Sequence, residues 1–159
     1  MADTLYLGAD HAGFELKEKL KAYLKKKGVT VRDLGAWKLD KHDDYPDYAF
    51  PVAKLVVQTG SKGILVCGSA EGICIAANKV KGARAVPIWS VKNARVSRQH
   101  NDANILCIAG GKTVAKTHGL GLSFSQAKKI VDAWISEPFL GAARHVRRLH
   151  KISRFEHHG

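Results

Sequence analysis

The stretch Gly63-Ile64-Leu65-Val66-Cys67 runs directly into Gly68-Ser69-Ala70-Glu71-Gly72, and this pair of segments decides the fold class. The first segment is apolar at every position, as strands buried on both faces of a parallel sheet are. The second is rich in small residues, and residues 72–79 continue as a small-residue helix. A buried strand, a small-residue loop and a helix in this order are typical of a βαβ unit.

The same alternation of strand and helix continues on both sides of this stretch. The sequence predicts strands over 5–8, 29–31, 63–67, 84–89 and 104–109, and helices over 14–27, 47–59, 72–79, 93–100, 127–135 and 137–156. Residues 109–125 are expected to form a long loop because they are rich in glycine and serine. Strands that alternate with helices predict an α/β fold with a parallel sheet covered on both faces, in one domain over 1–159.

Composition limits the class of protein further. The 159 residues are 45% hydrophobic and 25% charged, which suits one globular domain. No apolar run approaches the roughly 20 residues of a membrane helix, and the N-terminus shows no signal-peptide pattern. The cysteines (Cys67, Cys74 and Cys107) are odd in number and lie in apolar segments. We therefore expect no disulfide framework and a cytoplasmic location.

The excess of basic residues indicates an anionic partner. Lys and Arg number 26 against 14 Asp and Glu, a formal charge of +12. Six lysines between Lys17 and Lys27 alternate with apolar residues, which predicts a helix with a solvated basic face. No zinc-finger or RNA-recognition pattern is present, and no aromatic residues lie among the bases as stacking platforms. A phosphorylated small molecule is therefore favoured, with nucleic acid as the alternative.

Ligands of parallel sheets bind at the carboxyl ends of the strands, so the residues after each strand are the first candidates for a site. The loop Gly8-Ala9-Asp10-His11-Ala12-Gly13 follows the first strand. Asp10 either caps the next helix or serves a ligand, and His11 beside a helix N-terminus is placed to meet a phosphate. The adjacent histidine and the flanking glycines favour a ligand loop.

The loop after the third strand is the second candidate. Its small residues allow backbone N–H groups to form an anion-binding nest. Cys67 stands at its start, where the dipole of the following helix favours the thiolate. The alternative interpretation of Cys67 is a small apolar residue that ends a core strand.

Two further candidates lie in the C-terminal half. His100, at the end of a predicted helix, is either a general acid or base or an ordinary surface histidine. Arg144 and Arg148 share one helical face and either clamp a phosphate or form a solvated basic surface. Because no metal-ligand pattern, Walker A loop or dinucleotide motif is present, we predict no metal and no cofactor.

Taken together, five segments resemble the type B ribose-5-phosphate isomerase family, which also includes galactose-6-phosphate isomerase subunits and allose-6-phosphate isomerases. The segments are GADHAG (8–13), DYPDYA (44–49), GILVCGSAEGICIAANKVKGARA (63–85), SRQHNDANIL (97–106) and KKIVDAW (128–134). The resemblance implies a Rossmann-like α/β/α sandwich with a five-stranded parallel sheet. It also implies a homodimer or tetramer with active sites between two subunits, in which the C-terminal helix over 137–156 packs on the partner subunit.

The implied reaction is the reversible isomerisation of ribose 5-phosphate and ribulose 5-phosphate, a step of the pentose phosphate pathway, without a metal. The base that moves the proton between C2 and C1 is either a cysteine, matched here by Cys67, or a glutamate, at the position of Ile73. His100, helped by Asp10, would open the sugar ring. Ser69 would hydrogen-bond Cys67 or the substrate.

The resemblance also implies a set of substrate-binding residues on both halves of the chain. This set comprises Asp10, His11, Tyr45, Gly68, Ser69, Ala70, Glu71, Gly72, Asn101, Lys112, Arg144 and Arg148. Lys112 stands where the family usually has an arginine. The alternatives to the pentose isomerase are an isomerase of allose 6-phosphate or galactose 6-phosphate, and a basic nucleic-acid or nucleotide-binding protein without isomerase activity.

Overall fold

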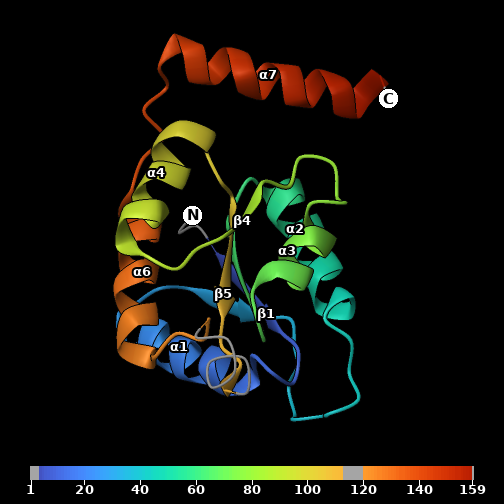
Figure 1. The fold of residues 1–159 in the computed structure, drawn as a ribbon, viewed down its shortest axis with the longest axis vertical. Coiled ribbons are helices and arrows are strands. Elements are labelled where there is room, and N and C mark those ends of the chain that lie inside the picture. The colour runs from blue at the N-terminus through green and yellow to red at the C-terminus, as the bar shows by residue number, and fades with distance from the viewer. Residues whose placement is uncertain (1–3, 113–119, 159) are drawn as a thin grey trace.

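The computed structural model describes residues 4–112 and 120–158 and confirms the predicted α/β/α sandwich. Its centre is a five-stranded parallel sheet in the order β2-β1-β3-β5-β4 (Figure 1). The strands are β1 (Leu5–Ala9), β2 (Val31–Asp33), β3 (Lys62–Cys67), β4 (Ala85–Pro87) and β5 (Ile105–Ala109). β3 is the middle strand and is buried from its second residue onward, as its apolar sequence predicts.

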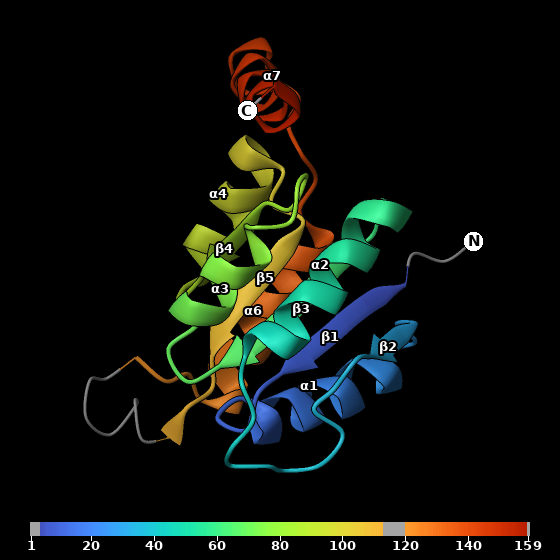
Figure 2. The same ribbon diagram turned by 90° about the vertical axis from the view of Figure 1, so that its right-hand side faces the viewer.

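Helices cover both faces of the sheet (Figure 1). Of the helices that the structure describes, three pack on one face: α1 (Phe14–Lys26), α4 (Val91–Asn101) and α6 (Phe124–Ser136). Two pack on the other: α2 (Pro46–Thr59) and α3 (Glu71–Ala77). The last helix, α7 (Ala143–His158), lies across the end of the sandwich at which α4 ends (Figures 1 and 2).

Among the strands, β2 and β4 differ most from their predicted positions. The strand predicted at 29–31 is wrong by two residues, because the Val29 N–H donates to the Leu24 carbonyl at 3.0 Å and still belongs to the end of α1. Gly28, with φ of +80°, makes the turn between that helix and β2. The strand predicted at 84–89 is shortened to β4, an edge strand that contains Pro87.

Among the helices, α6 and α7 begin furthest from their predicted starts. α6 starts at Phe124 rather than 127, because Ser123 and Gln126 form a capping box. The helix predicted over 137–156 is wrong at its start: Glu137 is extended, as expected for a residue before a proline, and α7 begins only at Ala143. Of the long loop predicted over 109–125, residues 113–119 lie outside the described residues.

The predicted basic face of α1 is only partly solvated. Lys17 is fully buried, and its Nζ donates to both carboxylate oxygens of Asp33 at 2.8 Å and to the Ala36 carbonyl at 2.6 Å. Lys21 binds the same carboxylate at 2.6 Å. These lysines therefore tie α1 to β2 instead of facing an anionic partner. No helix among the described residues is long and apolar enough to cross a membrane.

Candidate active site

Three loops meet at the carboxyl edge of the sheet, and glycines permit the contact. Gly13 lies against the end of β3, where an added Cβ would be 2.2 Å from the Val66 carbonyl oxygen. Gly111, after β5, lies against Gly68, where a Cβ would be 2.7 Å from the Gly68 Cα. Side chains at these two positions would push the loops apart, so the glycines hold the candidate site together.

Asp10 is buried at this junction. Its Oδ1 accepts a hydrogen bond from the Gly13 N–H at 3.1 Å, which closes the loop. Asp10 is not the N-cap residue of α1, because that position is Gly13, which has no side chain to accept the N–H groups of the first turn. Burial raises the pKa of Asp10, while the Gly13 hydrogen bond and His11 oppose the rise. A buried carboxyl group with a raised pKa is a candidate for proton transfer.

Cys67 ends β3 next to Asp10 and is almost fully buried. The sequence predicts a lowered pKa from the helix dipole, and this is wrong for the protein alone. Burial raises the pKa of the Cys67 thiol, and the negative charge of Asp10 adds to the rise. Backbone N–H groups of Ile73, Ser69 and Ala70 act in the opposite direction by hydrogen-bonding the sulfur. The loop therefore supplies donors for a thiolate that the surrounding burial disfavours.

The conformation of the loop explains how its N–H groups reach the sulfur. Ala70 adopts the left-handed region with φ of 68°, which few residues other than glycine do, and turns the chain immediately before α3. Ser69 is partly buried in this turn, and Glu71 is exposed in the first turn of α3. Tyr45 packs on the same turn, since a Cβ added to Gly72 would lie 2.9 Å from the tyrosine ring.

A cleft of about 530 Å³ opens beside this junction, between the first loop and the segment after β5. His11, Gly111 and Lys112 line it, together with Glu15. The Lys112 ammonium pairs with Glu15 at 2.6 Å, and this contact helps to lower the pKa of that carboxyl group to about 2. The cleft therefore presents a histidine and a lysine at the carboxyl edge of the sheet.

The remaining predicted residues lie at the opposite end of the molecule. α4 leaves the carboxyl edge after β4 and runs back, so His100 and Asn101 in its last turn lie near the amino edge of the sheet (Figures 1 and 2). Arg144 and Arg148 are exposed on α7 at the same end. One chain thus brings Asp10, His11 and Cys67 together, but not with His100 or the two arginines.

The second group has its own organisation. The His100 ring stacks on His145 of α7, with the ring centres 4.4 Å apart and the planes 12° from parallel. His145 is buried, and its Nε2 has no hydrogen-bond partner in the described part of the chain. Burial and the positive charges of His100, Arg144 and Arg148 lower the pKa of His145. The stack fixes the start of α7 against the end of α4.

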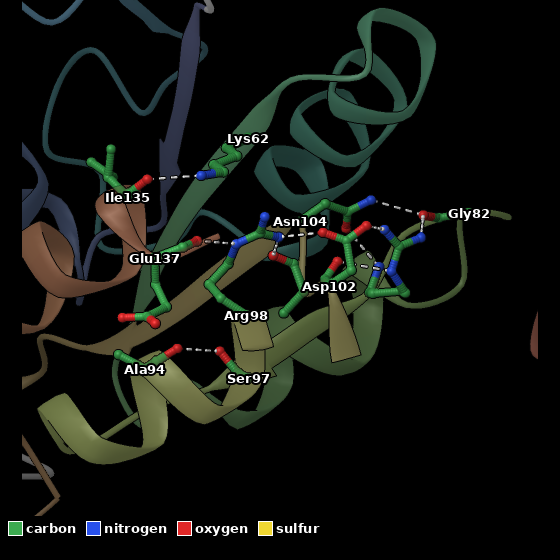
Figure 3. A network of polar contacts seen from close by, with 11 residues as sticks. Lys62, Gly82, Ala94, Ser97, Arg98, Asp102, Asn104, Ile135 and Glu137 are labelled. Atoms are coloured by element: carbon green, nitrogen blue, oxygen red, sulfur yellow. Dashed lines mark hydrogen bonds and ion pairs between the residues drawn. The ribbon is translucent and has the colours of Figure 1, made fainter. Parts of the chain in front are cut away.

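A network of polar contacts joins the end of α4 to the segments before β4 and after α6 (Figure 3). The buried Arg98 donates to the Asp102 carboxylate at 2.7 Å and to the Glu137 carbonyl at 3.3 Å. Arg84, the residue before β4, binds the other oxygen of Asp102 at 2.9 Å. These bonds fix the turn after Asn101 and the segment that leads to α7.

The chain is similar to known proteins over nearly its whole length. The model of the Ribose/Galactose Isomerase family matches residues 5–152. The chain belongs to this family. It is 41% identical over 158 residues to the probable ribose-5-phosphate isomerase B of Mycoplasma genitalium, an alignment that covers 98% of this chain and 97% of that protein. It is 45% identical over 151 residues to the ribose-5-phosphate isomerase B of Escherichia coli, covering 94% and 93% of the two chains.

A solved structure of this family supports the same conclusion. The ribose-5-phosphate isomerase B of Mycoplasma genitalium with bound ribulose-5-phosphate superposes with a TM-score of 0.90 at 40% identity, covering 100% of this chain and 99% of that one. Membership in an isomerase family confirms the resemblance drawn from the five sequence segments. Of the two base positions expected in the family, Ile73 is fully buried in the core, whereas Cys67 stands at the loop.

Sequence reasoning missed two residues at these sites. Asp43, in the loop before α2, binds His11 at the carboxyl edge, and its only signal is its place directly before the 44–49 motif. His145 lies between Arg144 and Arg148, and no motif in the sequence marks it. Its burial depends on where α7 begins, which the sequence placed too early. No group of three metal-ligating side chains occurs among residues 4–112 and 120–158.

Proposed function

We propose that this chain is an aldose–ketose isomerase that interconverts ribose 5-phosphate and ribulose 5-phosphate, with Cys67 as the general base. The observation that carries this proposal is the position of Cys67, which ends β3 beside Asp10 at the start of the small-residue loop. The relative that binds ribulose-5-phosphate supports the choice of substrate. The reaction belongs to the pentose phosphate pathway, and the three free cysteines suit a cytoplasmic enzyme.

In this mechanism the thiolate takes the proton from C2 and returns it to C1. The negative charge moves to an oxygen of the enediolate, and N–H groups of residues 68–72 stabilise that oxygen. Preorganised donors of this kind are often the largest contribution to the rate. Ser69 hydrogen-bonds Cys67 or the substrate, and Tyr45 and Glu71 line the same turn.

The ring-opening step needs a second copy of the chain. His100 and Asn101 lie at the amino edge of the sheet, far from Cys67 in the fold. We infer a homodimer in which His100 of one chain meets Asp10 and Cys67 of the other, with tetramers formed by pairing such dimers. In this arrangement His100 and Asp10 move the proton that opens the furanose ring, and Asn101 holds a sugar hydroxyl.

The phosphate is bound by cations from both chains. His11 and Lys112 line the cleft of one chain, and Arg144 and Arg148 come from α7 of the other. α7 carries exposed apolar residues, Ile152 and Phe155, which are suited to cover the partner. Binding energy from the phosphate orients C1 and C2 against the thiol, which raises the rate.

The test is isomerisation of ribose 5-phosphate by the purified protein, with allose 6-phosphate and galactose 6-phosphate beside it. We expect turnover of the pentose that is lost in Cys67→Ala and retained in Cys74→Ala, a second buried cysteine of the same core. Turnover of a hexose phosphate alone would show that the proposed substrate is wrong, while Cys67 would remain the proposed base. The isomerase proposal would be overturned if the folded protein turned over no sugar phosphate and bound nucleic acid with an affinity that falls steeply with salt. That result would favour a nucleic-acid-binding protein.

A further inference from the structure

Asp43 makes two contacts with His11 that the reaction scheme above does not use. One oxygen, Oδ1, accepts the backbone N–H of His11 at 2.9 Å and lies 2.7 Å from Nδ1 of its ring. The Asp43 side chain is only 7% exposed, whereas that of His11 is 38% exposed. A buried carboxylate therefore holds one side of an imidazole whose other side is open.

The contact determines which ring nitrogen carries a proton. An ionised carboxylate only accepts hydrogen bonds, so Nδ1 of His11 must be the donor. Nε2, which makes no hydrogen bond to any residue that the structure describes, is left for solvent or a ligand. A carboxylate behind a histidine commonly fixes the tautomer and the orientation of the ring in this way.

The charges around His11 favour its protonated form. The hydrogen bond that His11 donates to Asp43 raises the pKa of His11, partial burial opposes the rise, and the charge of Asp10 adds to it. On the cleft side, Glu15 is paired with Lys112. Tyr48, next to Asp43, is neutral, since burial and that carboxylate raise its pKa to about 12.

We propose that Asp43 is a positioning residue, which holds His11 as an imidazolium with Nε2–H available to the phosphate group of the substrate. This inference rests on the proposed function for the identity of the anion and deepens it at one residue. An imidazolium cannot accept a proton, so His11 binds the substrate and does not act as a base. Charge-assisted hydrogen bonds to phosphate are among the stronger polar contacts in proteins.

The substitution Asp43→Asn separates this role from a merely structural one. The asparagine keeps the size and a carbonyl oxygen for the His11 backbone N–H, and it removes the negative charge. Asp40→Asn is the matched control, because Asp40 lies in the same loop and is exposed, and its side chain accepts, among the described residues, only the His42 N–H at 3.0 Å. Both variants lose one negative charge, but only the first loses it beside the imidazole.

The first measurement is an NMR titration of the His11 ring nitrogens in both variants. The pKa of His11 should fall in Asp43→Asn and stay unchanged in Asp40→Asn. The second is inhibition by inorganic phosphate and the KM for ribose 5-phosphate at pH 6 to 9. We expect both constants to rise about tenfold at neutral pH in Asp43→Asn, with kcat little changed, as for the loss of one hydrogen bond to a charged group.

The proposal also predicts the direction in which phosphate affinity changes with pH. Phosphate binds best below the pKa of His11 and more weakly as pH rises through it, so Asp43→Asn should move this loss to lower pH. In His11→Ala a further Asp43→Asn change should have no effect on KM. An unchanged His11 pKa in Asp43→Asn, or an additive effect of the two substitutions, would overturn the proposal. The titration and the phosphate inhibition need no turnover, so they decide on Asp43 even where the isomerase assay fails.

Discussion

Cys67 is held between two opposing influences. Burial and Asp10 favour the thiol, while three backbone N–H groups favour the thiolate. A sugar phosphate that fills the site changes the surroundings of the sulfur, but the protein alone keeps it mostly protonated near neutral pH. This balance differs from that of a permanently ionised cysteine, whose reactivity would already be high without substrate.

The balance predicts how the free thiol titrates. Because the pKa of Cys67 is raised, its alkylation by iodoacetamide should be slow at pH 7 and accelerate as pH rises above 9. In Asp10→Asn one cause of the rise is removed, so the acceleration should begin at lower pH. The measurement is the alkylation rate against pH, with the site of modification found by mass spectrometry. Equal profiles for the two proteins would show that Asp10 does not affect the sulfur.

Gly13 offers a second prediction at this scale. A Cβ there would lie 2.2 Å from the Val66 carbonyl and 2.9 Å from the Cys67 nitrogen, and both are backbone atoms that cannot turn away. Gly13→Ala should therefore lower the free energy of unfolding by about 3 kcal/mol. Gly28→Ala, where φ is +80° and space is open, should cost only about 1 kcal/mol. Urea unfolding of both variants compares them, and equal losses would contradict the contact.

At the scale of elements, the N-terminus of α6 depends on two side chains. Ser123 accepts the Gln126 N–H at 3.2 Å, and the Gln126 side chain accepts the Ser123 N–H at 2.9 Å. Ser123→Ala should cost about 1 kcal/mol of stability. Ser136→Ala, at the other end of the same helix, should be nearly neutral because that hydroxyl only bonds back to its own helix. Thermal unfolding is the measurement, and a larger loss at Ser136 would argue against the cap.

The sequence predicted every strand and helix in the described part of the chain but misplaced some of their ends. β3 is detected as an unbroken apolar run, and α1 is detected because apolar side chains recur on one face of the helix. Such patterns do not detect that Val29 still bonds to α1, or that Glu137 is extended, because these depend on single backbone contacts. The strand order and the buried ion pair of Lys17 with Asp33 depend on contacts distant in sequence, which no local pattern shows.

The candidate site was predictable where it follows a strand and not where it depends on other elements. Asp10 follows β1 and Cys67 ends β3, so the rule for parallel sheets locates them. Asp43 lies in a loop between β2 and α2, and only the folded chain shows it against His11. The sequence identifies His100 as a candidate general acid or base. Its position at the opposite end of the sheet depends on the direction in which α4 runs.

At the scale of the whole molecule, His100 and the two arginines of α7 lie at the opposite end of the sheet from Asp10 and Cys67. If each site combines the carboxyl edge of one chain with α4 and α7 of another, Asp10→Asn and Arg144→Ala damage different halves. Each variant alone is expected to be nearly inactive. A dimer with one copy of each variant contains one site with both halves intact and one with both damaged. Random reassembly of equal amounts makes about half of the dimers mixed, so about a quarter of wild-type activity should return.

The control for this mixing experiment uses two variants of the same half. Asp10→Asn and Cys67→Ala both act at the carboxyl edge, so in their mixed dimers each site retains one damaged residue and no activity returns. The measurement is turnover of ribose 5-phosphate after denaturation and reassembly, with mixed dimers verified by a tag on one chain. Recovery in the first mixture and none in the second requires a site shared between chains. Equal results in the two mixtures would place all of its residues in one chain, against the direction in which α4 runs.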